Sequence, residues 1–116
     1  MGEDLVSLNV GGAIFMTRKS TLKDSNSFFS GLVASCEEHS APIFVDRDPT
    51  FFRYILNYMR GTKTYPNDEK SVEQLIAEAE FYSMVEYASF LRGKIDEVRK
   101  DGIAHGLRVL ANKINF

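Results

Sequence analysis

The stretch Phe44–Tyr58, FVDRDPTFFRYILNY, passes from strand formers through a charged triplet into an aromatic-rich segment, and it decides the fold. Residues 43–45 favour a short strand, which Pro49 ends because proline lacks a backbone N–H and has a fixed φ. Proline also suits the first position of a helix, so Asp48 is the expected N-cap. Apolar side chains then recur at i, i+3, i+4 and i+7, which predicts a buried helix of about twelve residues. These side chains are Phe52, Ile55, Leu56 and Met59.

The triplet between strand and helix has mixed charge. Asp46 and Asp48 flank Arg47 at a point where a solitary domain has little use for an organised cluster. Such a cluster favours contact with a partner, because charge-assisted hydrogen bonds fix the register of two surfaces. The alternative is a helix cap with a local ion pair.

The second half of the chain is helical by pattern. Arg60-Gly61 predicts a helix end with a left-handed last residue, and Gly61–Lys70 reads as a surface loop. Ser71 with Gln74 forms a capping-box pattern for another helix. Its expected solvent face carries Glu73, Glu78 and Glu80. A last apolar series fits the core face of an amphipathic helix better than a short coiled-coil seam: Met84, Ala88, Leu91, Ile95 and Val98.

The first half predicts a hairpin and two short helices. Residues 6–10 alternate apolar and polar side chains, and Gly11-Gly12 separates them from a second strand-like run at 13–17. Adjacent glycines favour a tight turn because both accept positive φ. Residues 17–22 are typical of a short helix, and Asn26 is the expected cap of the next. Strands near the start and helices at the end predict the α+β class.

Length, charge and cysteine content bound the kind of protein. At 116 residues the chain suits one domain, and a formal charge of −2 leaves no basic stripe for nucleic acid. The single Cys36 cannot form an internal disulfide. No apolar run approaches a membrane span and no signal-peptide pattern is present, which predicts a cytoplasmic protein without membrane contact. The expected domain covers residues 1–100, and residues 101–116 are a tail, an arm or the start of a missing domain.

One segment holds chemistry-bearing side chains. Cys36-Glu-Glu-His39 contains a thiol, two carboxylates and an imidazole, the ingredients of half a metal site or of a cysteine–histidine pair. The other histidine, His105, lies in the tail. Neighbouring side chains in a polar loop rarely converge, so a solvated loop is favoured over a small thiol- or metal-dependent enzyme. The sequence therefore predicts no catalytic residue, no metal and no cofactor.

Motifs spread in order along residues 4–92 resemble the BTB/POZ domain of the potassium-channel tetramerisation-domain (KCTD) family. The motifs are VSLNVGG (6–12), Phe15, Thr17, TL (21–22), SFF (27–29), FVDRDP (44–49), Phe52, ILNY (55–58) and EAEFY (78–82). The resemblance implies a BTB/POZ fold, an N-terminal β-hairpin plus short sheet covered by a cluster of α-helices. Two features depart from the family. No proline stands ahead of Ser27, and Cys36 alone cannot supply the zinc site that some channel versions build between subunits.

The resemblance also implies a function. Such domains assemble into rings of identical copies, here a homo-pentamer by family habit or alternatively a homo-tetramer. Many are non-enzymatic adaptors that bring substrates to a cullin-3 ubiquitin ligase. The alternative is an assembly domain of a potassium channel, which requires this chain to be a fragment, or a scaffold or corepressor with no ligase link. Residues carried over to the contact between copies are Asn9, Gly11, Gly12, Asp46, Arg47 and Asp48.

The cullin-3 contact implied by the resemblance falls on parts of residues 32–39, 58–65 and 81–85. Candidate contact residues are Leu32, His39, Tyr58, Tyr65, Phe81 and Met84. Exposed aromatic and methionine side chains are typical anchors of interfaces, because they bury large areas at small entropic cost. The alternative is that Tyr58, Phe81 and Tyr82 belong to the core.

Overall fold

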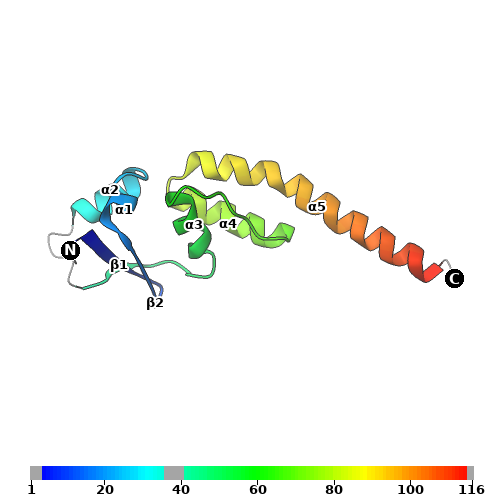
Figure 1. Ribbon diagram of the computed structural model, residues 1–116, viewed down its shortest axis with the longest axis horizontal. Coiled ribbons are helices and arrows are strands. Elements are labelled where there is room, and N and C mark those ends of the chain that lie inside the picture. Colours follow the sequence, from blue (N-terminus) through cyan, green and yellow to red (C-terminus); the bar gives the residue numbers. More distant parts are fainter. Residues whose placement is uncertain (1–3, 36–40, 115–116) are drawn as a thin grey trace.

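The computed structural model describes residues 4–35 and 41–114 of the chain, with 101–114 described by their backbone. The elements follow in the order β1 (Leu5–Val10), β2 (Ala13–Arg18), α1 (Lys19–Lys23), α2 (Ser27–Ala34), β3 (Ile43–Val45), α3 (Phe52–Met59), α4 (Glu69–Phe81) and α5 (Val85–Ile114). Two of the strands open the chain, and the three elements that follow β3 are helices (Figure 1). The predicted α+β class is confirmed.

The chain opens with the predicted β-hairpin. Strands β1 and β2 are antiparallel, and Val10 faces Ala13 at the closed end. Gly11 and Gly12 form the turn with φ values of +56° and +105°. Both angles lie in the region that glycine accepts most readily, as a tight primed turn requires. The Asn9 side-chain oxygen accepts a hydrogen bond from the Gly12 N–H at 2.8 Å, which closes the turn.

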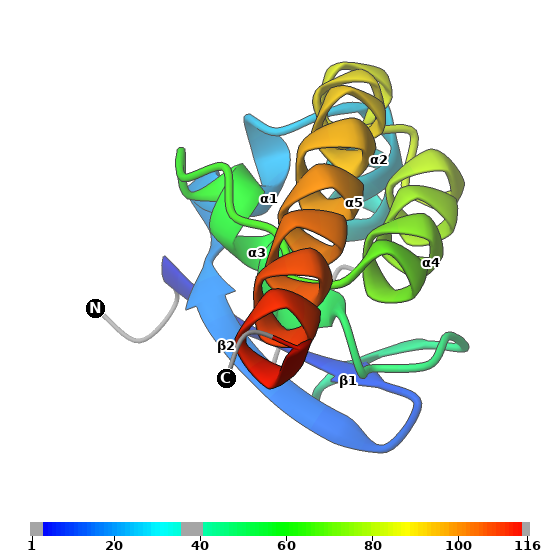
Figure 2. The same cartoon turned by 90° about the vertical axis from the view of Figure 1, so that its right-hand side faces the viewer.

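Within the described residues the sheet has three strands in the order β2-β1-β3, and β3 runs parallel to β1. A parallel neighbour needs a crossover, which α1 and α2 supply between β2 and β3. Figure 2 shows the helices gathered on one side of β1 and β2. The alternating residues of β1 that face these helices are buried, namely Val6, Leu8 and Val10. The sheet therefore has one covered face and one open face.

The core lies between the covered sheet face and the helices. Its centre is aromatic, since the Tyr82 ring lies 5.1 Å from that of Phe29 and 5.5 Å from that of Phe52. Aromatic pairs at such distances contribute about 0.5–1.5 kcal/mol each beyond the burial of their area. The helix residues that complete this core include Leu22, Ile55, Leu56, Val72, Leu75, Ile76 and Ala79.

Helix α3 begins later than predicted, at Phe52. The Phe52 N–H donates to the Pro49 carbonyl at 3.0 Å, so a turn precedes the helix. The Asp48 carboxylate accepts a hydrogen bond from the Thr50 N–H of this turn at 2.8 Å. The predicted N-cap role of Asp48 is therefore wrong, because the turn that Pro49 starts uses this carboxylate first. The predicted end of the helix is confirmed, with Gly61 at a φ of +98°.

Two other helix starts differ from the sequence pattern. The N-cap of α4 is Asp68, whose side chain accepts a hydrogen bond from the Ser71 N–H at 2.9 Å. The capping box predicted at Ser71 is thus wrong, because Asp68 offers an equally good cap one turn earlier. Helix α1 starts at Lys19 rather than Thr17, which stays buried in β2. The cap predicted at Asn26 is confirmed, since its side chain accepts from the Phe29 N–H at 3.1 Å.

Helix α5 packs along α4 and continues far past it. The core-face interpretation is confirmed for the buried residues Met84, Ala88, Leu91 and Val98. The distal part of α5 runs away from the other elements (Figure 1). None of the helices in the described part of the chain is both long and apolar enough to cross a membrane. The domain boundary at residue 100 stays a prediction, because α5 passes through it without a break.

A strained residue joins α4 to α5. Ser83 has a φ of +62°. The adjacent Met84 N–H donates to the Ala79 carbonyl at 2.8 Å, a helix-ending arrangement that normally carries glycine at the left-handed position. Serine there is disfavoured because its Cβ crowds the backbone.

We expect Ser83→Gly to raise the free energy of unfolding by about 0.5–1 kcal/mol, measured by urea denaturation. Ser35→Gly is the matched control, because Ser35 ends α2 with a φ of −77° and releases no strain. Its free energy of unfolding should stay equal or fall. A lower stability for Ser83→Gly would show that the Ser83 side chain makes a contact worth more than the strain.

Candidate interaction surfaces

The hairpin tip meets the segment between β3 and α3. The Gly11 N–H donates to the Val45 carbonyl at 3.0 Å. A Cβ placed on Gly11 would lie 2.3 Å from the Arg47 carbonyl oxygen, a distance that no side chain tolerates. Glycine is required here both by this approach and by its positive φ. The structure thus brings the predicted contact residues of the hairpin against the charged triplet, although they are more than thirty residues apart in sequence.

The Arg47 side chain is engaged within its own chain. Its Nε and Nη2 donate to the two carboxylate oxygens of Glu78 at 3.2 and 2.5 Å. Its guanidinium also lies 4.0 Å from the centre of the Phe81 ring. The hydrogen bond with Glu78 is the main cause that raises the pKa of Arg47, opposed by partial burial. The local ion pair that the sequence left as an alternative is therefore present, and an Arg47 role between copies stays a prediction.

Glu78 is the residue that the sequence reading misplaced. Its side chain is 15% exposed, against 30% for Arg47, so it does not belong to the solvent face predicted with Glu73 and Glu80. Helical spacing alone assigned it outward, and only the fold shows a cation from another segment beside it. A partly buried bidentate pair of this kind is stronger than an exposed one.

The two acids of the triplet behave differently from Arg47. Asp48 is exposed, and its carboxylate accepts hydrogen bonds from the Thr50 N–H and from the Thr50 Oγ1 at 2.8 and 2.5 Å. These hydrogen bonds stabilise the charged form and lower the pKa of Asp48. Asp46 is exposed as well. Both acids are therefore available at the surface while Arg47 is held by Glu78.

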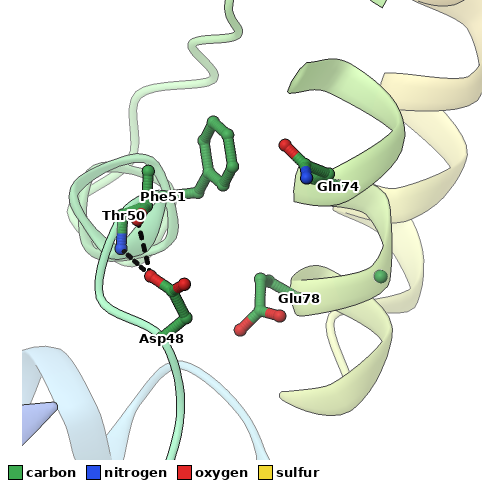
Figure 3. Close-up of a pocket in the computed structure, with 6 residues that line it drawn as sticks. Asp48, Thr50, Phe51, Gln74 and Glu78 are labelled. Atoms are coloured by element: carbon green, nitrogen blue, oxygen red, sulfur yellow. Dashed lines mark hydrogen bonds between the residues drawn. The ribbon is translucent and has the colours of Figure 1, made fainter. Parts of the chain in front are cut away.

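A hollow of about 350 Å³ opens beside the triplet, between the β3–α3 segment and α4. We call it the Asp48 hollow; its lining residues are Asp48, Thr50, Phe51, Gln74, Ala77 and Glu78. Figure 3 shows Asp48, Thr50 and Phe51 on one wall, facing Gln74 and Glu78 across the opening. Its walls combine an aromatic ring, a small apolar residue and carboxylates.

A second hollow, of about 300 Å³, lies at the junction of α4 and α5. We call it the Tyr58 hollow; its lining residues are Ser25, Asn26, Tyr58, Ser83, Met84, Val85 and Glu86. Tyr58 stacks on Tyr87 with ring centres 4.5 Å apart, and burial raises the pKa of its hydroxyl. Val85 is 76% exposed at the rim.

The structure separates the candidate cullin-3 residues. Tyr58 and Met84 share the Tyr58 hollow, although Met84 is itself mostly buried. Phe81 is 43% exposed but lies under Arg47, on the other surface. Tyr65 packs edge-on against Phe90, with ring centres 5.9 Å apart. Of the remaining candidates, Leu32 is partly buried, and His39 lies outside the described residues.

Tyr82 belongs to the core, as the alternative interpretation held, and burial strongly raises the pKa of its hydroxyl. Among the residues that the structure describes, histidine, cysteine and carboxylate side chains form no group able to hold a metal ion. The Cys36–His39 segment considered from the sequence lies entirely outside the described residues.

Comparison with known proteins places the chain. The BTB/POZ domain family matches residues 6–90. BTB/POZ domain-containing protein KCTD5 of Mus musculus is 34% identical over an alignment 116 residues long. This alignment covers 90% of this chain and 50% of that protein. KCTD17 of Homo sapiens is 34% identical over 98 residues, covering 79% and 31%. The potassium channel regulatory protein of Mus musculus is 40% identical over 89 residues, covering 72% and 34%.

The matched class is a protein-interaction and oligomerisation domain, and its members are typically not enzymes. Its expected fold, a hairpin and short sheet covered by helices, is the one described above. The chain belongs to the KCTD family of BTB/POZ domains. It spans half or less of the length of the relatives it matches.

The ion pair between Arg47 and Glu78 makes a measurable prediction. Arg47→Glu opposes two carboxylates in a partly buried position, so we expect the free energy of unfolding to fall by about 1–2 kcal/mol. Exchanging both residues, Arg47→Glu with Glu78→Arg, should regain most of that loss in urea denaturation. Arg92→Glu is the control, because its pair with Glu80 is half exposed on both sides and should change stability little. Equal losses in the single and the exchanged variant would contradict the pairing.

Proposed function

We propose that this domain assembles into a cytoplasmic ring of five copies, or alternatively four, and that the ring binds cullin-3 as an adaptor of a ubiquitin ligase. The observation that carries the ring is the meeting of the hairpin tip with the β3–α3 segment. Gly11 and the backbone of the charged triplet, which the family resemblance assigns to the contact between copies, meet there from separate parts of the chain. This convergence is fixed by backbone contacts, so it is present before any partner arrives.

A ring interface is heterologous, meaning that one face of each copy meets a different face of the next. The surface beside the triplet suits one side of such a contact because its charges are already positioned. Arg47 is held by Glu78 and Phe81, so little side-chain entropy remains to be lost when copies meet. The exposed Asp46 and Asp48 then supply charge that selects the orientation of the neighbour.

The Tyr58 hollow supports the proposed cullin-3 contact. It contains Tyr58 and Met84 and has the exposed Val85 at its rim. Partners commonly insert an apolar anchor into such a hollow, where surrounding contacts exclude water. The triplet lies elsewhere, beside the Asp48 hollow, and the two hollows have no lining residue in common. Ring assembly and cullin binding can therefore occur together, without any catalytic step in this domain.

The second candidate function is an assembly domain for a potassium channel, or a scaffold without a ligase link. One similar protein is named a potassium channel regulatory protein, which favours this alternative. Both functions use the same ring. They differ in whether the Tyr58 hollow has cullin-3 as its partner.

Native mass spectrometry tests the proposal directly. The domain alone should appear as five copies, or four, and should gain mass when the N-terminal region of cullin-3 is added. Isothermal calorimetry at micromolar concentration should show the same binding. A folded monomer would overturn the ring, whereas an intact ring that releases no heat with cullin-3 would leave the scaffold or channel alternative.

A single substitution tests the cullin surface. We expect Val85→Asp to weaken cullin-3 binding by about tenfold or more, because a carboxylate replaces an exposed apolar side chain at the rim. The ring mass should not change. Glu73→Lys, an exposed change on α4 that does not line the Tyr58 hollow, is the control and should bind normally. Unchanged affinity for Val85→Asp would move the cullin contact away from this hollow.

A further inference from the structure

The open face of the sheet carries several large, exposed apolar side chains. Phe44 is 60% exposed, Ile14 and Met16 are each 57% exposed, and Leu5 is 43% exposed. Alternation along β2 puts Ile14, Met16 and Arg18 on the same side. Because Asn9 pairs with Ile14 on one side and with Phe44 on the other, the polar Asn9 lies between these two apolar side chains in a row across the three strands, and Ser7 lies beside Met16 in the same way. We call this surface, comprising Leu5, Ile14, Met16, Arg18 and Phe44, the outer sheet face.

Such a surface is unusual for a domain that stays alone in water. Natural strands at the edge of a sheet normally carry charges that prevent association, and β2 carries only Arg18 on this side. The helices lie on the opposite side of the strands (Figure 2) and leave the outer sheet face uncovered. Large exposed apolar side chains grouped around the polar Ser7 and Asn9 favour an interaction surface of mixed character.

The Asp48 hollow has complementary chemistry. Phe51 and Ala77 provide apolar walls, and a hollow of about 350 Å³ accepts a large side chain. Asp48 adds a surface carboxylate whose only hydrogen bonds among the described residues come from Thr50. A surface that combines apolar knobs with a guanidinium therefore matches a hollow that combines apolar walls with a carboxylate.

We propose that the outer sheet face of one copy docks onto the Asp48 hollow of the next copy, with Phe44 or a neighbouring apolar side chain entering the hollow and Arg18 approaching Asp48. This inference rests on the proposed ring and names the two faces that build it. The two faces are different surfaces of the same chain, as a head-to-tail ring requires. Two outer sheet faces packed on each other would instead give a closed dimer and place two Arg18 side chains in one interface.

Two substitutions separate the two faces. Phe44→Glu places a charge on the outer sheet face, and Ala77→Trp fills the Asp48 hollow. Both positions are exposed, so each variant should keep the circular dichroism spectrum and melting temperature of the parent subunit. We expect each variant alone to run as a monomer in light scattering at tens of micromolar. Val85→Asp removes another exposed apolar side chain outside both surfaces and should keep the ring.

Mixing the two monomeric variants gives the decisive result. The Ala77→Trp copy retains a good outer sheet face, and the Phe44→Glu copy retains a good hollow, so one productive contact can form. Neither of the two remaining faces can bind a further copy, because one carries a charge and the other is filled. We expect a one-to-one dimer in native mass spectrometry and nothing larger.

The outcomes distinguish this inference from the ring itself. A full-sized ring from Phe44→Glu, or monomers that fail to pair on mixing, would overturn the docking of these two faces while the ring of the parent protein stands. Dimers formed by either variant alone would overturn it in favour of a face that packs on itself. A parent protein that is monomeric would instead overturn the proposed ring.

Discussion

The close approach of the Gly11 backbone to the Arg47 backbone is the constraint on which the surface depends. The Gly11 N–H bonds to the Val45 carbonyl, and no side chain at position 11 would leave room for the Arg47 oxygen. This contact seals the end of the β1–β3 pairing and directs the chain toward Pro49 and α3. The charged triplet therefore leaves the sheet at one fixed place, beside the hairpin tip and facing α4. The backbone of Gly11 therefore determines where the charged triplet lies on the surface.

From that place the Arg47 side chain reaches α4 and links two layers of the fold. Its pair with Glu78 and its contact with the Phe81 ring join the β3–α3 segment to the last turn of α4. Tyr82, which follows Phe81 in the sequence, packs in the aromatic core against Phe29. The polar surface and the hydrophobic centre are consequently adjacent along one helix end. A substitution at Arg47 changes the packing against Phe81 as well as the surface charge. Its effect on assembly can therefore be interpreted only when the stability of the subunit is known.

Sequence patterns identified the elements better than the contacts between them. Alternation in β1, the paired glycines and the apolar spacing of α3 to α5 were sufficient, because each is a local signal. The helix starts at Phe52 and Glu69 were misplaced, since several residues near each start can cap and only the turn geometry selects one. The pairing of Arg47 with Glu78 was missed, because helical spacing assigns a face to solvent without knowing which cation another segment will place there. The open sheet face was missed for a related reason: alternation tells that a strand has two faces, but not that helices cover only one.

The ion pair also changes the charge that the triplet presents. Arg47 is neutralised by Glu78, so the two exposed acids, Asp46 and Asp48, determine the character of this surface. A triplet that looks balanced in the sequence is thus acidic toward a partner. In the proposed ring, the acidic surface of each copy would meet a basic surface of its neighbour, since two identical acidic faces would repel each other. Arg18, held at the end of β2 on the open side of the sheet, provides such a basic residue within the same chain, which is why the charge pattern favours a head-to-tail ring over a face-to-face pair.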